Sequence, residues 1–233
     1  MYMDAAEFIK SEISSLSKWE RIFFPIILII IIFIYIYKGD SKIALISAVC
    51  GISYTILAGK GRIYCYFIGL LGSLCYSYLS YKNAFYGQVI LYCCYFIPMQ
   101  IIGIFAWRKH LKKESYEIIK TRLENKKRVI GTLVMFIIAF IAACILKMTG
   151  DASPYMDSCA LIFSIAGQYL TLKRCIEQWP VWFFVNLVTL IMWIQAYLRG
   201  SATLALIFIW LVYLFLAVYF LYCWQRELKE NNY

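Results

Sequence analysis

The sequence predicts an all-α membrane protein: eight transmembrane helices, arranged as two parallel three-helix repeats, a connecting helix and an extra N-terminal helix. The first observation is composition, since hydrophobic residues make up 63% of the 233 positions and the mean hydropathy is +0.72. Soluble domains are only about half apolar. The second is that the apolar residues form eight runs of 16–23 residues, close to the roughly 20, or about 17 at the least, that cross a bilayer. These runs cover residues 22–37, 43–58, 63–81, 88–107, 129–147, 157–172, 179–198 and 202–224.

The third observation is where the charges lie. The formal net charge of +10 would by itself suggest a nucleic-acid partner. With eight spans, however, most of the 23 Lys and Arg residues fall on the side that holds both termini, and the largest cluster lies in residues 108–128. Basic loops face the cytoplasm. We therefore expect a multi-pass protein of the cell (inner) membrane with both termini cytoplasmic, whose basic charge faces the lipid bilayer and not nucleic acid.

An internal repeat sets the organisation along the chain. Sliding the sequence along itself by about 116 residues pairs Gly51 with Gly167 and Tyr66 with Trp182. A shift of four spans keeps their orientation, which indicates parallel repeats related by an axis along the membrane normal. The expected segments are a cytoplasmic amphipathic N-terminus (1–21), the extra transmembrane helix (22–38), the first repeat (42–107), a basic cytoplasmic loop (108–128), the connecting helix (129–147), the second repeat (157–225) and a cytoplasmic tail (226–233). In the basic loop Lys and Glu alternate as in a solvated helix.

Several function classes are excluded by residues that the spans lack. The nine cysteines form no C-x-x-C motif, and the single histidine, His110, lies in the basic loop, so we expect no metal, cofactor or disulfide. No Asp, Glu, Lys or Arg lies deep in any span. Ion-coupled carriers usually need such a group, and enzymes need a reactive cluster. The sequence therefore predicts an uncoupled carrier and not an enzyme.

The span that begins near Gln178 carries the strongest candidate for a binding site. Trp179, Trp182 and Asn186 follow one another at i, i+3 and i+7, which places them on one stripe of a helix, and Trp193 lies close to that face. Two indole faces beside an amide suit a flat, polar, aromatic solute, and they add a cation–π attraction if the solute is cationic. We expect these four residues to contact a solute.

Two other spans place amides in the hydrocarbon. Gln100 and Trp107 share a helical face, with Gly103 between them, and Gln168 follows Gly167. Because lipid offers no hydrogen bonds, each amide must find a partner inside the bundle. Two interpretations stay open for these glutamines and for Asn186: contact with a solute, or hydrogen bonds between helices. For the tryptophans near span ends, a place in the interfacial aromatic belt is the competing interpretation.

Two motifs resemble those of a known family. Residues 173–182 contain K-x-x-x-E-x-W-x-x-W, and residues 98–108 contain P-x-Q-x-x-G-x-x-x-W. Together they resemble the signature regions of PnuC-type vitamin transporters, and the resemblance extends over roughly residues 43–227. One departure is that the second repeat has no counterpart of Gly103.

The resemblance implies a SWEET-like fold, a homotrimer, and facilitated diffusion of nicotinamide riboside, which cytoplasmic phosphorylation then traps. By the same resemblance Trp182, Asn186, Gln100 and Trp179 are substrate or gate residues. Members of this family also carry thiamine or riboflavin. The sequence leaves open which of these vitamins is the substrate.

Overall fold

The computed structural model describes residues 16–39, 41–82, 86–111, 117–148, 153–199 and 204–230. Most of the expected amphipathic N-terminus, residues 1–15, lies outside the described residues. Residues 40, 83–85, 112–116, 149–152, 200–203 and 231–233 also lie outside the described residues. All statements below concern the described part of the chain.

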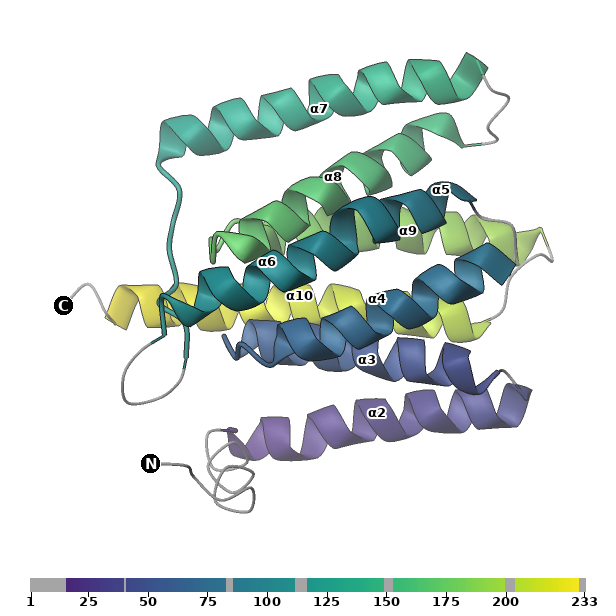
Figure 1. Cartoon of the computed structure of the whole chain (residues 1–233), viewed down its shortest axis with the longest axis horizontal. Helices are drawn as coiled ribbons and strands as arrows, with labels where there is room; N and C mark the ends of the chain where they lie inside the picture. Colours follow the sequence, from purple (N-terminus) through teal and green to yellow (C-terminus); the bar gives the residue numbers. More distant parts are fainter. Residues whose placement is uncertain are drawn as a thin grey trace.

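Eight long helices lie side by side, and one of them is interrupted by a π-helical turn (Figure 1). The described residues otherwise contain only isolated β-bridges, so the predicted all-α class is confirmed. The helices are α2 (Lys18–Lys38), α3 (Lys42–Gly59), α4 (Cys65–Lys82), the continuous α5 (Tyr86–Leu91), η1 (Tyr92–Phe96) and α6 (Ile97–Arg108), then α7 (Asn125–Met148), α8 (Pro154–Leu172), α9 (Gln178–Leu198) and α10 (Leu204–Glu230).

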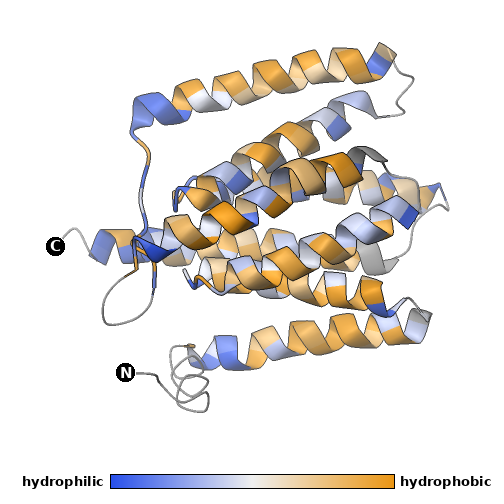
Figure 2. Cartoon of the chain, viewed as in Figure 1, coloured by the Kyte–Doolittle hydropathy of each residue, from blue (hydrophilic) through white to orange (hydrophobic). Residues whose placement is uncertain are grey.

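Six of these helices are long and apolar enough to cross a membrane. Apolar residues dominate the ribbons of Figure 2, and α7 in particular exposes Ile137 and Phe140 by 59% and 61%. α4 and α8 fall outside this group of six, and α4 shows why. Its serines Ser73, Ser77 and Ser80 lower the hydropathy but are buried, so they face the protein and not lipid. The membrane class predicted from composition is confirmed.

The first helix begins earlier than its apolar run. Ser17 accepts a hydrogen bond from the Glu20 backbone, and the Glu20 carboxylate accepts one from the Ser17 backbone at 2.7 Å. This capping box starts α2 at Lys18, four residues before the run expected at 22. At the other end Gly39 adopts a left-handed conformation (φ 68°), which favours glycine, and closes the helix. Pro25 consequently lies inside α2.

Two groups of three helices form the centre of the bundle. In the first triplet (α3, α4 and α5–η1–α6) α4 packs against both of the others, and in the second triplet (α8, α9 and α10) α9 does so. Between the triplets α6 packs against α8, and α10 packs against α3. The last helix of each triplet therefore contacts the first helix of the other. α2 packs on α3, and α7 packs on α8 at the opposite edge (Figure 1).

The turn inside each triplet repeats the same backbone hydrogen bonds. The five bonds made by the N–H groups of residues 60, 61, 62, 65 and 66 recur at residues 173, 174, 175, 178 and 179, with acceptors shifted equally. Gly61 and Arg174, the matching residues, both have positive φ (69° and 61°). The repeat register at the turn is therefore 113 residues and not about 116. The expected pairing of Tyr66 with Trp182 was wrong, and Tyr66 instead corresponds to Trp179.

Residues 117–123, here called the crossing segment, connect the two turns. Ile118 N donates to Gly61 O at 3.0 Å, and Thr121 N donates to Arg174 O at 2.9 Å. Ile118 is fully buried. The alternation of Lys and Glu had suggested a solvated helix, which is wrong for these residues: they are extended, and α7 begins only at Asn125. Backbone groups paired with two turns hold this part of the basic loop against the bundle.

Candidate functional site

Trp182 lies on α9 and is turned toward α8, inside the second triplet. Its Nε1 donates to Thr171 Oγ1 at 3.2 Å, and the same hydroxyl donates to Gly167 O at 2.9 Å. A Cβ atom on Gly167 would lie 2.9 Å from Cε2 of Trp182, so the absence of a side chain lets the indole approach the α8 backbone. The Trp182 side chain is only partly buried. Its orientation is fixed by a hydrogen bond, yet part of its surface stays accessible.

A cluster of polar side chains, here called the amide cluster, lies where the two triplets meet. It consists of Tyr54 on α3, Gln100 on α6 and Gln168 on α8. The Tyr54 hydroxyl donates to Gln168 Oε1 at 3.1 Å. Gln100 also interacts with this hydroxyl, and a Cβ on Gly69 would lie 2.7 Å from Tyr54 Cδ2 and 2.8 Å from Gln100 Nε2. The structure thus brings together the two predicted glutamines, from different triplets, around one tyrosine.

Several buried polar atoms in this region have no hydrogen-bond partner among the described residues. They include Gln100 Oε1, Gln168 Nε2 and Trp179 Nε1. Gln100 is 3% exposed and Gln168 is 1% exposed, so lipid and bulk water do not reach them. An unpaired buried polar group costs roughly 1–3 kcal/mol. Such groups call for an explanation, and a polar ligand that completes the hydrogen bonds is one.

Trp107 and Trp179 form a second layer nearer the crossing segment. Trp107 Nε1 donates to Thr171 O at 3.1 Å, and Tyr66 packs edge-on against it at 4.9 Å between centroids. In the second triplet Trp224 donates to Gly59 O at 2.6 Å, and Trp179 packs edge-on against it at 5.7 Å. Each indole hydrogen bond joins the last helix of one triplet to the first helix of the other.

The other two predicted site residues lie further along α9. Asn186 is one turn beyond Trp182 and 6% exposed. Trp193 lies eleven residues beyond Trp182, which corresponds to about 16 Å along the helix axis. In the described part of the chain no ring contact or hydrogen bond joins Trp193 to the amide cluster. Six of the seven predicted residues therefore gather near the junction of the triplets, and Trp193 does not.

Two residues of this region were missed in the sequence. Tyr54 and Thr171 link the predicted residues to one another, through the Tyr54–Gln168 bond and through the two bonds that Thr171 accepts from indoles. Thr171 follows Gln168 at i+3 and so shares its helical face, a signal available in the sequence. Tyr54 is one of 20 tyrosines, and nothing local distinguishes it.

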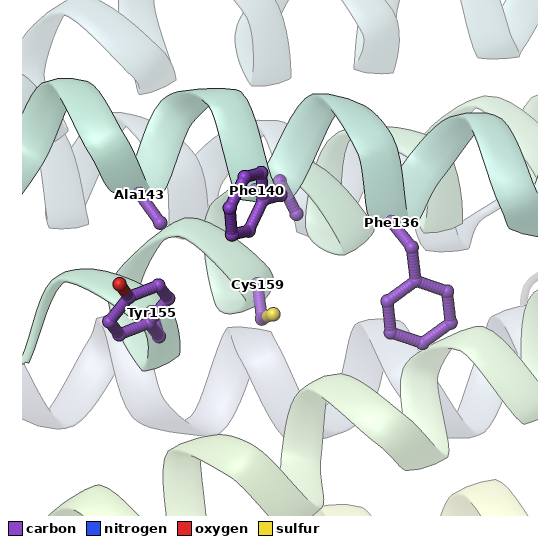
Figure 3. Close-up of a pocket in the computed structure, with 6 residues that line it drawn as sticks. Phe136, Phe140, Ala143, Tyr155 and Cys159 are labelled. Carbon is purple, nitrogen blue, oxygen red and sulfur yellow. The ribbon is translucent and has the colours of Figure 1, made fainter.

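A cavity of about 320 Å³ lies elsewhere, between α7 and α8 (Figure 3). Phe136, Phe140 and Ala143 of α7 face Tyr155 and Cys159 of α8 across it, and Ala139 completes the lining. Its lining is almost wholly apolar, and none of the predicted site residues belongs to it. It lacks the convergent polar groups that orient a polar solute.

Charged groups gather outside the amide cluster, at the end of the bundle that carries the crossing segment. Arg128 pairs with Glu177 at 2.9 Å, Lys60 pairs with Glu20 at 3.1 Å, and Lys120 pairs with Glu227. In the α8–α9 turn, burial raises the pKa of the Cys175 thiol, which keeps it protonated at neutral pH. The described residues contain no group of His, Cys, Asp and Glu able to hold a metal ion.

The sequence matches the family described as Nicotinamide mononucleotide transporter over residues 41–226. Among curated proteins, it is 29% identical to the nicotinamide riboside transporter PnuC of Neisseria mucosa over 204 residues, covering 85% of this chain and 78% of that protein. It is 27% identical to the nicotinamide riboside transporter PnuC of Haemophilus influenzae, covering 99% of this chain and 100% of that protein. The predicted resemblance to PnuC-type transporters is confirmed.

A solved structure gives the same result for the fold. The crystal structure of the vitamin B3 transporter PnuC matches with a TM-score of 0.82 at 27% identity, covering 98% of this chain and 99% of that one. The correspondence extends over nearly the whole chain, so it covers both triplets and the helices that flank them.

Replacement of Thr171 by Val tests the hydrogen bond that holds Trp182 against α8. Valine has nearly the same shape but no hydroxyl, so the Trp182 N–H loses its acceptor, and we expect a loss of stability of about 1–3 kcal/mol. The measurement is the thermal unfolding midpoint of the detergent-solubilised protein. Thr171→Ser restores the hydroxyl and should unfold close to the unchanged protein. Equal midpoints for Thr171→Val and the unchanged protein would show that this bond contributes nothing.

Proposed function

The chain belongs to the nicotinamide mononucleotide transporter family, a family of membrane transporters and not of enzymes, and we propose that it carries nicotinamide riboside by facilitated diffusion. The names of its relatives support this substrate. The observation in the chain that carries the proposal is the partly exposed indole of Trp182 packed against Gly167, which precedes Gln168, in a region where both buried glutamines have unpaired atoms. A pyridinium ring is flat and cationic, so it gains both stacking and a cation–π attraction, about 2 kcal/mol when desolvated.

The charge of the site favours the riboside over a phosphorylated nucleotide. Tyr54, Gln100, Gln168, Trp182 and Asn186 are all uncharged. A phosphate group that leaves water needs Lys or Arg to balance its charge. The described Lys and Arg side chains of the bundle lie in turns and near helix ends, as Arg62 and Arg174 do. A neutral or cationic solute therefore suits the cluster better than a mononucleotide.

In the proposed complex the pyridinium ring stacks on Trp182. The polar groups of the substrate form hydrogen bonds with Gln100, Gln168 and Asn186. Trp107 and Trp179 form the layer below, between the substrate and the crossing segment. Trp193 lies toward the other end of α9, where it serves as an outer contact on the route of the solute. No cofactor takes part.

We interpret the two triplets as parallel repeats that move against each other. The recurring turn bonds and the reciprocal contacts of α6 with α8 and α10 with α3 support a pseudo-twofold axis along the membrane normal. The indole bonds from Trp107 to Thr171 and from Trp224 to Gly59 span the triplet boundary, so they close the path at that end. Opening requires that these bonds break.

The same family resemblance supports the proposed surroundings. The beginning of α2 and the end of α10 lie at one end of the bundle, beside the basic crossing segment (Figure 1). By the positive-inside rule this end is cytoplasmic, so both termini are cytoplasmic in a protein of the inner membrane. The assembly expected from the resemblance is a homotrimer in the lipid bilayer.

The second candidate substrate is thiamine, and riboflavin is a third candidate. The favouring observation is that a single partly exposed indole accepts any flat cationic ring, including a thiazolium. Calorimetric titration of the purified protein with nicotinamide riboside, thiamine and riboflavin separates the candidates. Tightest binding of nicotinamide riboside supports the first.

Replacement of Trp182 by Ala should abolish nicotinamide riboside binding and uptake, because it removes the surface on which the ring stacks. Titration calorimetry measures binding, and proteoliposomes loaded with buffer measure uptake of the labelled riboside. Trp19→Ala is the matched control, since this indole is 79% exposed, and it should behave like the unchanged protein. Unchanged binding by Trp182→Ala would remove this residue from the site.

Transport should equilibrate the riboside without concentrating it, because no Asp, Glu, His, Lys or Arg lies in the amide cluster to couple an ion gradient. Proteoliposomes with and without imposed proton and sodium gradients provide the measurement. Equal final levels inside and outside, and equal rates under every gradient, are expected. Accumulation driven by either gradient would contradict uncoupled transport.

A further inference from the structure

The orientation of the two glutamines in the amide cluster is set by one hydroxyl group. Tyr54 has a single hydroxyl proton, and it goes to Gln168 Oε1 at 3.1 Å. The carbonyl end of Gln168 is therefore turned to Tyr54. Its Nε2, a donor with two hydrogens, has no partner.

Gln100 shows the opposite orientation. Its Nε2 end lies beside Tyr54, because a Cβ on Gly69 would lie 2.7 Å from Tyr54 Cδ2 and 2.8 Å from Gln100 Nε2, and the Tyr54 proton is already used. This leaves Gln100 Oε1 as an acceptor without a partner. The cluster thus offers one unpaired donor from α8 and one unpaired acceptor from α6, at the contact of the two triplets.

We propose that Tyr54 makes this transporter selective for a primary carboxamide on the ring of its substrate. This inference rests on the proposed function and assigns its recognition to particular atoms. The carboxamide C=O accepts from Gln168 Nε2, and the carboxamide N–H donates to Gln100 Oε1. Both unpaired atoms are then satisfied by one planar group, with Tyr54 holding the two glutamines in the required orientation.

Other substituents at the same ring position can form a hydrogen bond with only one of the two glutamines. A methyl ketone has the acceptor for Gln168 but places a methyl group against Gln100 Oε1. A carboxylate has only acceptors, so it leaves Gln100 Oε1 facing another oxygen. A site whose buried polar groups are built for a given N–H discriminates strongly against an analogue that lacks it.

The experiment compares three pyridinium ribosides that differ only at the ring 3-position. These are nicotinamide riboside, 3-acetylpyridine riboside and nicotinic acid riboside, titrated calorimetrically into the purified full-length protein. The unchanged protein should bind the carboxamide at least about tenfold more tightly than the ketone or the carboxylate. Because this comparison uses the unchanged protein, it does not depend on whether a variant folds.

Two variants identify the atoms. Gln100→Leu removes the unpaired acceptor, so its preference for carboxamide over ketone should fall toward onefold. Tyr54→Phe removes the hydroxyl that orients both glutamines, so Gln100 can turn its N–H group toward a carboxylate, and the preference for carboxamide over carboxylate should fall at least several-fold. The matched controls are Gln225→Leu and Tyr37→Phe, at exposed positions on α10 and α2, and both should keep the preferences of the unchanged protein.

The two possible failures give different results. If the unchanged protein binds none of the ribosides, the proposed function is wrong, and this inference falls with it. If it binds the three ribosides equally, or if Gln100→Leu keeps the full preference, transport of the riboside stands and the role of the amide cluster in selectivity is overturned.

Discussion

Hydrogen-bond satisfaction in a medium without water is the constraint on which this structure depends. Within the hydrocarbon every buried donor and acceptor must pair inside the protein. Most of these groups are paired; the indole N–H of Trp107, for example, donates to Thr171 O. Among the named exceptions, Gln100 Oε1, Gln168 Nε2 and Trp179 Nε1 lie where the two triplets meet. A polar solute that pairs with these atoms would remove the cost of leaving them unpaired, so the same constraint that stabilises the bundle supports the proposed binding site.

The polar contacts between the triplets are few and specific. Two indole-to-carbonyl bonds and the crossing segment join the triplets at one end, and the bonds from Tyr54 to Gln168 and from Tyr95 to Ile165 O join them in the interior. Helices in lipid gain little from hydrophobic attraction to one another, so van der Waals packing and a small number of hydrogen bonds decide how firmly they associate. A solute that bonds Gln100 in one triplet and Gln168 in the other adds a contact between the triplets, and so changes the balance between them. This gives substrate binding a direct physical route to the movement of one repeat against the other.

Much of the fold, and less of the site, could be predicted from the sequence. The all-α membrane class, the family and the inward face of α9 follow from apolar length, motif and spacing. The register was misread because Tyr66 and Trp182 are similar aromatic residues, while the turn bonds that set it are made by backbone atoms. The crossing segment was misread because its partners are backbone groups of distant turns. Tyr54 could not be selected among 20 tyrosines, since its role depends on two glutamines that are remote in sequence.

The most direct test of the central claim is an experimental structure of the protein with nicotinamide riboside bound. The account predicts the pyridinium ring on the face of Trp182, with its carboxamide within hydrogen-bonding distance of Gln100 and Gln168, between α6 and α8. A riboside bound in the apolar cavity between α7 and α8, with the two glutamines still unpaired, would contradict it.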